Sequence, residues 1–303
     1  MIGTAIRRTR AYATLVRLPN LFTAPPDVVA GVALAVGVGG TVTSSTVFGL
    51  AVASMLLYAA GTTLNDYFDA SDDAHERPER PIPSGEVARP RALALGLGFL
   101  AAGVVTAVVA AGTAAGVISG LLALTVLLYD GVLTGSAVGC LAMGAMRGLN
   151  VCLGVTAALS PVLLPRWALA VPIIVTAFIT GVTWTAAHET GTSDRTAVVP
   201  AIGGVVVAVL GTGGLLLVRS PRAGKVLLAV ILLACFLGWT GRALRSAVET
   251  PTPETIGAAV GACVLGLPVL ESAFAATIDP VLALLAAAFV VPAMGFARVF
   301  SVS

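Results

Sequence analysis

The feature that most limits how this chain can fold is a series of apolar runs, each about 20 residues long and almost free of charge. A helix of that length crosses the hydrocarbon core of a bilayer, which is about 30 Å thick. Strands are excluded as the spanning elements, because the runs lack alternation and the open edge of a sheet leaves backbone groups unpaired in lipid. The sequence therefore predicts an all-α, polytopic membrane protein.

The runs predict a bundle of nine or ten transmembrane helices around a central cavity. They lie at residues 21–40, 46–65, 92–111, 114–130, 136–159, 167–188, 197–218, 225–247, 256–274 and 280–299. The last two are separated only by AATIDP (275–280), which is compatible with two crossings or with one crossing and a half-buried segment. Hydrophobic residues make up 57% of the chain and charged residues 11%, which is typical of a membrane protein and not of a water-soluble domain.

Lys and Arg in the short loops favour one orientation in the membrane. If the N-terminus is cytoplasmic, that face collects the arginines at positions 7, 8, 10, 17, 77, 80, 89, 91, 195, 242, 245 and 298, whereas the outer face has Arg166, Arg219, Arg222 and Lys225. The cluster VRSPRAGK (218–225) opposes this orientation. The abundance of Ala, Gly, Val and Arg is typical of a GC-rich bacterial genome. We therefore expect a bacterial cytoplasmic membrane, with the N-terminus and the site on the cytoplasmic side. No basic stripe with interleaved aromatic residues indicates a nucleic-acid partner.

The most charged stretch of the chain, NDYFDASDDAHERPERPIPSG (65–85), begins where the second apolar run ends. Asn65, Asp66, Asp69 and Asp73 are spaced so that a helix continuing past Asn65 brings them to one face. Clustered carboxylates repel one another unless a cation neutralises them. Carboxylate oxygens completed by phosphate oxygens are typical of a Mg²⁺ site. We therefore expect Mg²⁺ as the cofactor, in a site that is half-built until a phosphate ligand arrives.

Basic residues follow these carboxylates directly. Arg77 and Arg80 can make the bidentate phosphate contacts for which guanidinium is suited. The three prolines and the glycine within residues 78–85 keep this part out of a helix and give a loop over the mouth of the bundle. A merely solvated loop is the alternative. The carboxylates begin inside a span, however, where ionisable groups are costly, and this favours a binding site.

These residues resemble the first aspartate-rich motif of the UbiA-type intramembrane prenyltransferases, which is NDxxDxxxD followed by a loop similar to RPxPSG. Here the loop reads RPIPSG (80–85). Upstream, RLPNLFTAPPDVVAG (17–31) is similar to the opening helix of the family, and the resemblance implies that Asn20 faces the cavity. Downstream, residues 127–154 are similar to the fourth and fifth helices. This implies substrate-binding roles for Asn20, Asn65, Arg80, Tyr129, Asp130, Arg147 and Asn150.

The chain departs from the family pattern in two places. Family members often carry a basic residue shortly after the pair that corresponds to Tyr129 and Asp130, but residues 131–135 contain none. The second aspartate-rich motif, of a form such as DxxxD, is replaced by HETGTSDR (188–195), with carboxylates only at Glu189 and Asp194.

Four spans separate the second motif from the first, so both lie on the same face of the membrane. The resemblance therefore implies that Asp66, Asp69, Asp73, Glu189 and Asp194 are the metal ligands and catalytic residues. We expect one domain, residues 1–303, with the loops 66–91 and 189–196 covering the site.

The resemblance implies Mg²⁺-dependent transfer of a prenyl group from an allylic isoprenoid pyrophosphate to a hydrophobic acceptor, aromatic or lipid, with release of pyrophosphate. Metal ions and arginine neutralise the leaving group, and an apolar cavity shields the allylic carbocation from water. The isoprenoid tail would enter from membrane lipid. Two alternatives stay open. One is a terpene cyclase on the same scaffold, and the other is a non-catalytic relative that binds or transports an isoprenoid lipid, which the altered second motif favours.

Four other polar residues that need an explanation lie inside the apolar runs. We expect Arg147 to pair with Asp130 or to face a wet cavity, and Asn150, one turn later, to share its face. Asp27 is predicted to cap the first helix after Pro25 and Pro26. The sequence assigns no role to Glu271.

Overall fold

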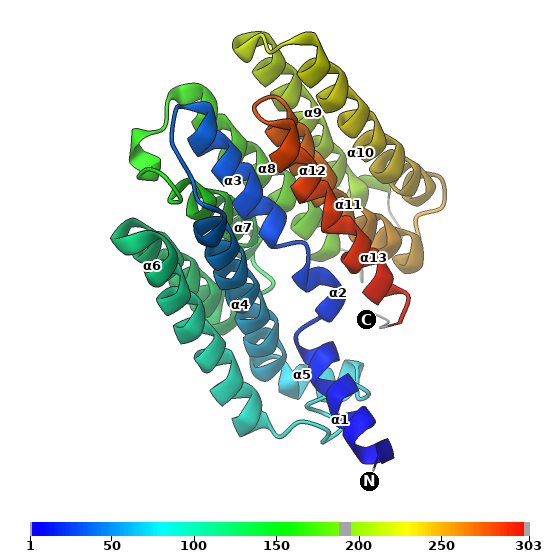
Figure 1. The fold of residues 1–303 in the computed structure, drawn as a ribbon. Helices are drawn as coiled ribbons and strands as arrows, with labels where there is room; N and C mark the ends of the chain where they lie inside the picture. The colour runs from blue at the N-terminus through cyan, green and yellow to red at the C-terminus, as the bar shows by residue number, and fades with distance from the viewer. Residues whose placement is uncertain (1, 188–194, 300–303) are drawn as a thin grey trace.

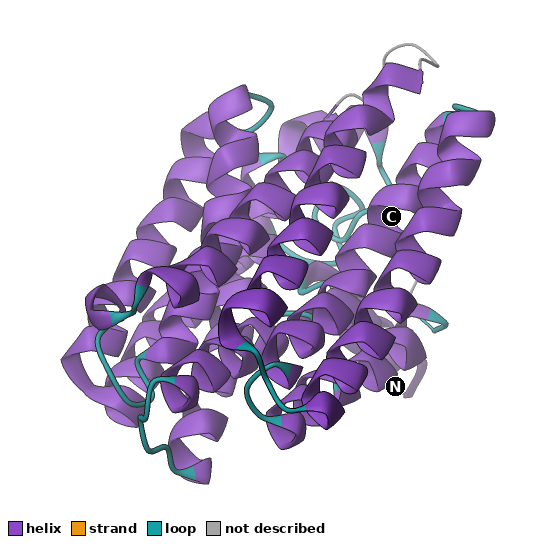
Figure 2. Ribbon diagram, turned by 90° about the horizontal axis from the view of Figure 1, so that it is seen from above, coloured by secondary structure: helices purple, strands orange, loops and turns teal. Residues whose placement is uncertain are grey.

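The computed structural model describes residues 2–187 and 195–299, and every regular element in them is a helix (Figures 1 and 2). The elements are, in chain order, α1 (Ile2–Leu15), α2 (Leu18–Leu21), α3 (Pro25–Gly37), α4 (Ser44–Phe68), α5 (Ala70–Glu76), α6 (Arg89–Leu128), η1 (Tyr129–Leu133), α7 (Ala137–Val155), η2 (Pro161–Leu163), α8 (Arg166–Ala187), η3 (Arg195–Val198), α9 (Val199–Arg219), α10 (Ala223–Glu249), α11 (Pro253–Ala276), α12 (Pro280–Ala288) and α13 (Val290–Ala297). The predicted all-α architecture is confirmed.

Nine helical stretches in the described part of the chain are long and apolar enough to cross a membrane. They include the 18-residue stretch Pro280–Ala297, which supports a separate crossing after α11. The residues just before α4 and α7 explain where these two helices begin. The hydroxyl of Thr43 accepts a hydrogen bond from the Thr46 amide at 3.2 Å, and that of Ser136 accepts one from the Gly139 amide at 3.0 Å. Both are N-caps, which satisfy amides that a helix leaves unpaired at its start.

The longest of the nine stretches folds back on itself at Gly112, where φ is 79° and ψ is −160°. Only glycine adopts this backbone conformation readily. Gly96, before the reversal, and Val126, after it, both lie against the segment 61–64 of α4. The start of the first arm of α6 and the end of the second arm therefore lie at the same end of the bundle. The two arms match the two separate spans that the sequence predicts. The nine stretches thus make ten passes.

Helices α3 and α7 cross at very short range. A Cβ atom on Gly31 would overlap the carbonyl oxygen of Val151, and one on Gly154 would overlap the carbonyl oxygen of Val28. Small residues of this kind let helix backbones approach closely in lipid, where packing replaces the hydrophobic effect as the main source of association. This crossing sets the separation between the polar residues that α3 and α7 carry.

The basic cluster at residues 218–225 is partly engaged in packing. Arg219 donates to the carbonyl oxygen of Gly37 at 3.3 Å and lies over the Trp167 ring, 4.2 Å from its centroid. Lys225 donates to the carbonyl oxygen of Ile278. These cations satisfy carbonyl groups at the C-terminal end of α3 and just after α11, where positive charge is favourable. The cluster thus has a structural role that explains its place on the face opposite the acidic motif.

Helix α1 is not among the nine apolar stretches and packs at the acidic end of the bundle. Its Ala11 and Leu15 are buried against Val87 and Ala92. Because Val87 ends the segment that follows the acidic motif, α1 holds this segment in place beside the mouth of the bundle.

Candidate active site

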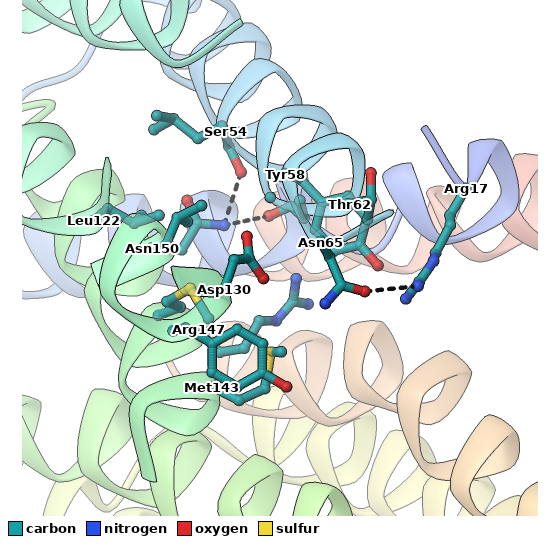
Figure 3. Close-up of a pocket in the computed structure, with 16 residues that line it drawn as sticks. Arg17, Ser54, Tyr58, Thr62, Asn65, Leu122, Asp130, Met143, Arg147 and Asn150 are labelled. Atoms are coloured by element: carbon teal, nitrogen blue, oxygen red, sulfur yellow. Dashed lines mark hydrogen bonds between the residues drawn. The ribbon is translucent and has the colours of Figure 1, made fainter. Parts of the chain in front are cut away.

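A cavity enters the bundle between α4, the end of α6 and α7 (Figure 3). Helix α4 lines it with residues spaced three or four apart, from Ser54 through Tyr58 and Thr62 to Asn65. These positions share one face of a helix and span about 16 Å at 1.5 Å per residue. Its walls are Arg17, Ala24, Ser54, Leu57, Tyr58, Gly61, Thr62, Asn65, Leu122, Val126, Tyr129, Asp130, Met143, Met146, Arg147 and Asn150. The cavity has a volume of about 160 Å³.

The inner end of the cavity is polar because α3 and α7 meet there. Arg147 donates from Nη2 to the Thr23 carbonyl oxygen at 2.6 Å, and its Nε lies 3.1 Å from Oδ2 of Asp27. Asn150 donates from Nδ2 to the same Asp27 oxygen at 2.8 Å and to Ser54 Oγ at 2.7 Å. The hydrogen bonds orient both α7 side chains, which also line the cavity.

Of the two alternatives expected for Arg147, the structure shows the second: Arg147 lines the cavity. Its ion pair is with Asp27, and none of the ion pairs among the described residues joins it to Asp130. The prediction for Asp27 is wrong. Asp27 does not cap its helix, since α3 has Ala24 at its N-cap and no side-chain cap bond. Asp27 is instead fully buried in the first turn of α3, where the α3–α7 crossing brings it to the guanidinium. The sequence gives no signal for this pairing, because the two residues lie far apart along the chain.

Glu271 adds a second buried carboxyl to this group. It is fully buried on α11 and faces Asp27. Neither of its oxygens has a hydrogen-bond partner in the described structure, and the same holds for Asp27 Oδ1. Two carboxyl groups thus lie side by side at membrane depth, and only that of Asp27 is paired with a guanidinium.

The mouth of the cavity carries the acidic motif. The Asp69 amide donates to the Asn65 carbonyl and the Asp73 amide to the Asp69 carbonyl, both at 2.9 Å, so helical spacing continues from α4 into α5. This confirms the prediction of a helix that continues past Asn65. The Asn65 side chain also donates to Asp69 Oδ2 at 3.0 Å. Burial and the neighbouring carboxylates of Asp73 and Asp72 raise the pKa of Asp69.

Two arginines from different parts of the chain reach these carboxylates. Arg80 is buried and lies 2.7 Å from Asp73 Oδ2 and 3.5 Å from Asp66 Oδ1. Arg17, which precedes α2, donates to Asn65 Oδ1 at 3.1 Å and lies 3.5 Å from Asp66 Oδ1 (Figure 3). The motif therefore presents mixed charge, with carboxylate oxygens and guanidinium groups in one layer at the mouth.

The donor atoms of this layer fit Mg²⁺. Asp66, Asp69 and Asp73 supply the hard oxygen ligands that the ion prefers. Among the described residues no three acidic, His or Cys side chains converge on one point, and Arg80 bridges Asp66 and Asp73. A metal ion would thus take over carboxylate oxygens that arginine contacts here. The expected ligands Glu189 and Asp194, and His188 beside them, lie outside the described residues.

Comparison with known proteins shows which family has this architecture. The sequence profile of the UbiA prenyltransferase family matches residues 28–239, more than half of the chain. The chain belongs to the UbiA prenyltransferase family. The resemblance found in its motifs is thereby confirmed.

Curated relatives include two digeranylgeranylglyceryl phosphate synthases. The one from Ignicoccus hospitalis is 41% identical over 98 residues, which is 32% of this chain and 30% of the relative. The one from Methanopyrus kandleri is 42% identical over 100 residues, 33% of this chain and 35% of the relative. The aligned part thus spans only about a third of these proteins.

Solved structures share the fold over most of the chain. A structure of digeranylgeranylglyceryl phosphate synthase has a TM-score of 0.61 at 18% identity and covers 88% of this chain and 97% of the other. A UbiA homologue from Aeropyrum pernix K1 also has a TM-score of 0.61, at 19% identity, covering 79% and 96%. A UbiA homologue from Archaeoglobus fulgidus, solved with DMAPP and Mg²⁺, has a TM-score of 0.56 at 12% identity, covering 86% and 99%. At these identities the likeness shows the fold.

The geometry separates residues that the sequence treats alike and adds some that it misses. Arg80 is buried at the mouth, whereas Arg77 is exposed. Asn20 does not line the cavity. Its side chain faces Tyr58, which does line it. Arg17 counts only as a loop charge in the sequence. Arg17 directly precedes the LPN segment (18–20) of the opening helix, and this position is the one sequence signal that places Arg17 near the cavity.

Proposed function

We propose that this member of the UbiA family transfers a prenyl group from an allylic isoprenoid pyrophosphate to a hydrophobic acceptor and releases pyrophosphate. The observation that carries the proposal is a single cavity with a charged mouth and a largely apolar wall. The mouth has the groups that bind a pyrophosphate, and the wall suits an isoprenoid chain. The family match supports the reaction class.

At the mouth, Asp66, Asp69 and Asp73 would hold Mg²⁺. When bound, Mg²⁺ supplies positive charge that stabilises the departing pyrophosphate. Arg80 adds charge-assisted hydrogen bonds to the phosphate oxygens. Arg17 reaches the same layer from the other side of Asn65, and we propose that it provides the basic contact that residues 131–135 lack. These groups favour the transition state, in which the negative charge on the leaving group is largest.

Further in, the wall protects the reactive carbon from water. Leu57, Leu122, Val126, Met143 and Met146 give the middle of the cavity an apolar surface. An allylic cation formed there meets few water molecules, so its capture by the acceptor is favoured over hydrolysis.

The acceptor we propose is a lipid alcohol that carries a glyceryl phosphate group. The support comes from the names of the relatives, whose product, digeranylgeranylglyceryl phosphate, bears two prenyl chains on one glyceryl phosphate. A geranylgeranyl donor follows from the same name. We further propose a bacterial cytoplasmic membrane as the location, with the N-terminus and the mouth on the cytoplasmic side, as the arginine distribution indicates.

The experiment incubates detergent-solubilised protein with geranyl, farnesyl or geranylgeranyl pyrophosphate, with Mg²⁺ or EDTA, and with or without a prenylglyceryl phosphate. Pyrophosphate release is assayed and the organic phase is analysed by mass spectrometry. Mg²⁺-dependent release that needs the acceptor supports the proposal, provided that the product has the mass of the acceptor plus one prenyl group minus one hydrogen. A cyclised hydrocarbon or alcohol without acceptor would make the protein a terpene cyclase. Binding of the pyrophosphate without release under any condition would indicate a non-catalytic lipid-binding relative.

A further inference from the structure

Asp130 is a buried carboxyl group on the wall of the cavity that has no partner of opposite charge. Its side chain is 6% exposed, and its Oδ2 atom has no hydrogen-bond partner among the described residues. Figure 3 shows the carboxyl pointing into the cavity between Asn65 and Asn150. A buried carboxyl without a cation is costly in a membrane, so its position calls for a functional reason.

Both arginines of the cavity are committed elsewhere. Arg147 is held by Asp27 and the Thr23 carbonyl, and Arg17 is held by Asn65 and Asp66. None of the ion pairs among the described residues includes Asp130. The Asn65 side chain is within hydrogen-bonding reach of this carboxyl, and Oδ2, which has no partner among the described residues, can interact with a ligand.

The local backbone aims this group at the reacting end of the cavity. Asp130 lies in η1, a π-helical turn that interrupts the α-helical path after α6, and such turns occur often at functional sites. Its carboxyl lies close to the side chain of Asn65, which begins the acidic motif, whereas Ser54 marks the inner end of the cavity (Figure 3). A pyrophosphate bound at the motif would thus place its C1 carbon close to Asp130.

We propose that Asp130 is the proton acceptor of the transfer reaction and that the acceptor substrate presents a hydroxyl group to it. This inference rests on the proposed function. The bond from C1 to the pyrophosphate oxygen breaks, and its electron pair leaves with pyrophosphate. A lone pair of the acceptor hydroxyl forms the new C–O bond to C1. The hydroxyl proton moves to the Asp130 carboxylate and later to water at the mouth.

The test compares Asp130→Asn and Asp130→Ala with wild type, in detergent, with geranylgeranyl pyrophosphate, Mg²⁺ and a prenylglyceryl phosphate. General base catalysis contributes about 100-fold or more, so we expect ether formation to fall by that factor in both variants. The KM for the prenyl pyrophosphate should change less than about twofold, because binding does not depend on the proton transfer. Glu76→Ala, which removes an exposed carboxylate of α5, is the matched control and should behave as wild type.

Chemical rescue separates proton transfer from a structural role. Asp130→Ala leaves room for a small carboxylic acid, so added formate should restore ether formation in proportion to its concentration, and it should not affect Asp130→Asn. Unchanged transfer in Asp130→Asn, or loss of activity in Asp130→Ala that formate does not restore, would overturn the base assignment alone. If wild type releases no pyrophosphate with any acceptor, the proposed function itself fails, and this result is distinct from either of those.

Discussion

Arg147 and Asp27 form an ion pair between α7 and α3, with Nε of the arginine 3.1 Å from Oδ2 of the aspartate. Asp27 is fully buried and Arg147 is 8% exposed. Asn150 donates to the same aspartate oxygen, so one carboxylate fixes two side chains of the cavity wall. The polar inner end of the cavity is thus built around a residue that does not itself line it.

Arg147→Met should destabilise the protein strongly. Loss of one partner of a buried ion pair leaves an uncompensated charge and costs about 3–5 kcal/mol. We expect a clear fall in the apparent unfolding temperature in detergent, and partial recovery when Asp27→Asn is added. Arg245→Met is the control, because the Arg245–Glu249 pair is exposed and its loss should leave the unfolding temperature unchanged. Equal stability of Arg147→Met and wild type would show that the pair is not a structural element.

Glu271→Gln should be at least as stable as wild type. The substitution keeps the shape of the side chain and removes one of two adjacent carboxyl groups, of which only Asp27 is paired with a guanidinium. The introduced amide can also donate to Asp27 Oδ1, which has no partner in the described structure. Glu271→Ala, by contrast, leaves a cavity and should lower the unfolding temperature. A lower unfolding temperature for Glu271→Gln would mean that the charge balance around Asp27 requires the carboxyl.

Gly154→Ala should separate α3 from α7. The new methyl group would overlap the Val28 carbonyl, and backbone atoms cannot move aside as a flexible side chain does. We expect a lower unfolding temperature. We also expect the contacts from Asp27 to Arg147 and Asn150 to lengthen, which should reduce the binding of a prenyl pyrophosphate. Gly98→Ala is the matched control, because a Cβ there meets no atom within 4 Å. A neutral effect of Gly154→Ala would mean that the crossing tolerates a wider spacing.

Periodic features of the sequence predict the local structure well. The spacing of the acidic motif gives the observed helical continuation, because hydrogen bonds between near neighbours decide it. Likewise, Arg147 and Asn150 share a helix face because they are three residues apart. The reversal at Gly112 falls between two runs that are each long enough to cross a bilayer.

Contacts between distant segments are not visible in the sequence. The choice of Asp27 over Asp130 as the partner of Arg147 depends on the crossing of α3 and α7, and the approach of Glu271 depends on α11. The place of Arg17 at the mouth depends on how α2 enters the bundle. Each of these follows from packing of whole helices, which spacing within one segment does not encode.

Arg80→Gln should weaken pyrophosphate binding far more than Arg77→Gln. Arg80 is buried beside Asp66 and Asp73, whereas Arg77, three residues earlier, is exposed. Charged hydrogen bonds to phosphate contribute roughly 1.5–3 kcal/mol, so we expect the Kd for pyrophosphate with Mg²⁺ to rise about tenfold or more in the first variant. Calorimetric titration of both proteins provides the measurement. Similar affinities in the two variants would argue against a phosphate contact by Arg80.

Asp69 should make stability in EDTA depend on pH. Burial and the charges of Asp73 and Asp72 raise the pKa of Asp69, so the folded protein binds this proton more tightly than the unfolded chain does. The contribution of Asp69 to stability is therefore present at low pH and is lost as pH rises from the ordinary carboxyl pKa through the raised one. The Asp69→Asn variant, which cannot ionise there, should gain stability relative to wild type over this interval.

Mg²⁺ should reverse that difference, because the ion neutralises the carboxylates that repel one another. At pH 7, adding Mg²⁺ after EDTA should raise the apparent unfolding temperature of wild type more than that of Asp69→Asn. Glu76→Gln, an exposed change on α5, should follow wild type throughout. Unfolding temperatures measured at several pH values in both conditions test the prediction. Parallel pH curves for wild type and Asp69→Asn in EDTA would contradict the raised pKa, and equal responses to Mg²⁺ would remove Asp69 from the metal site.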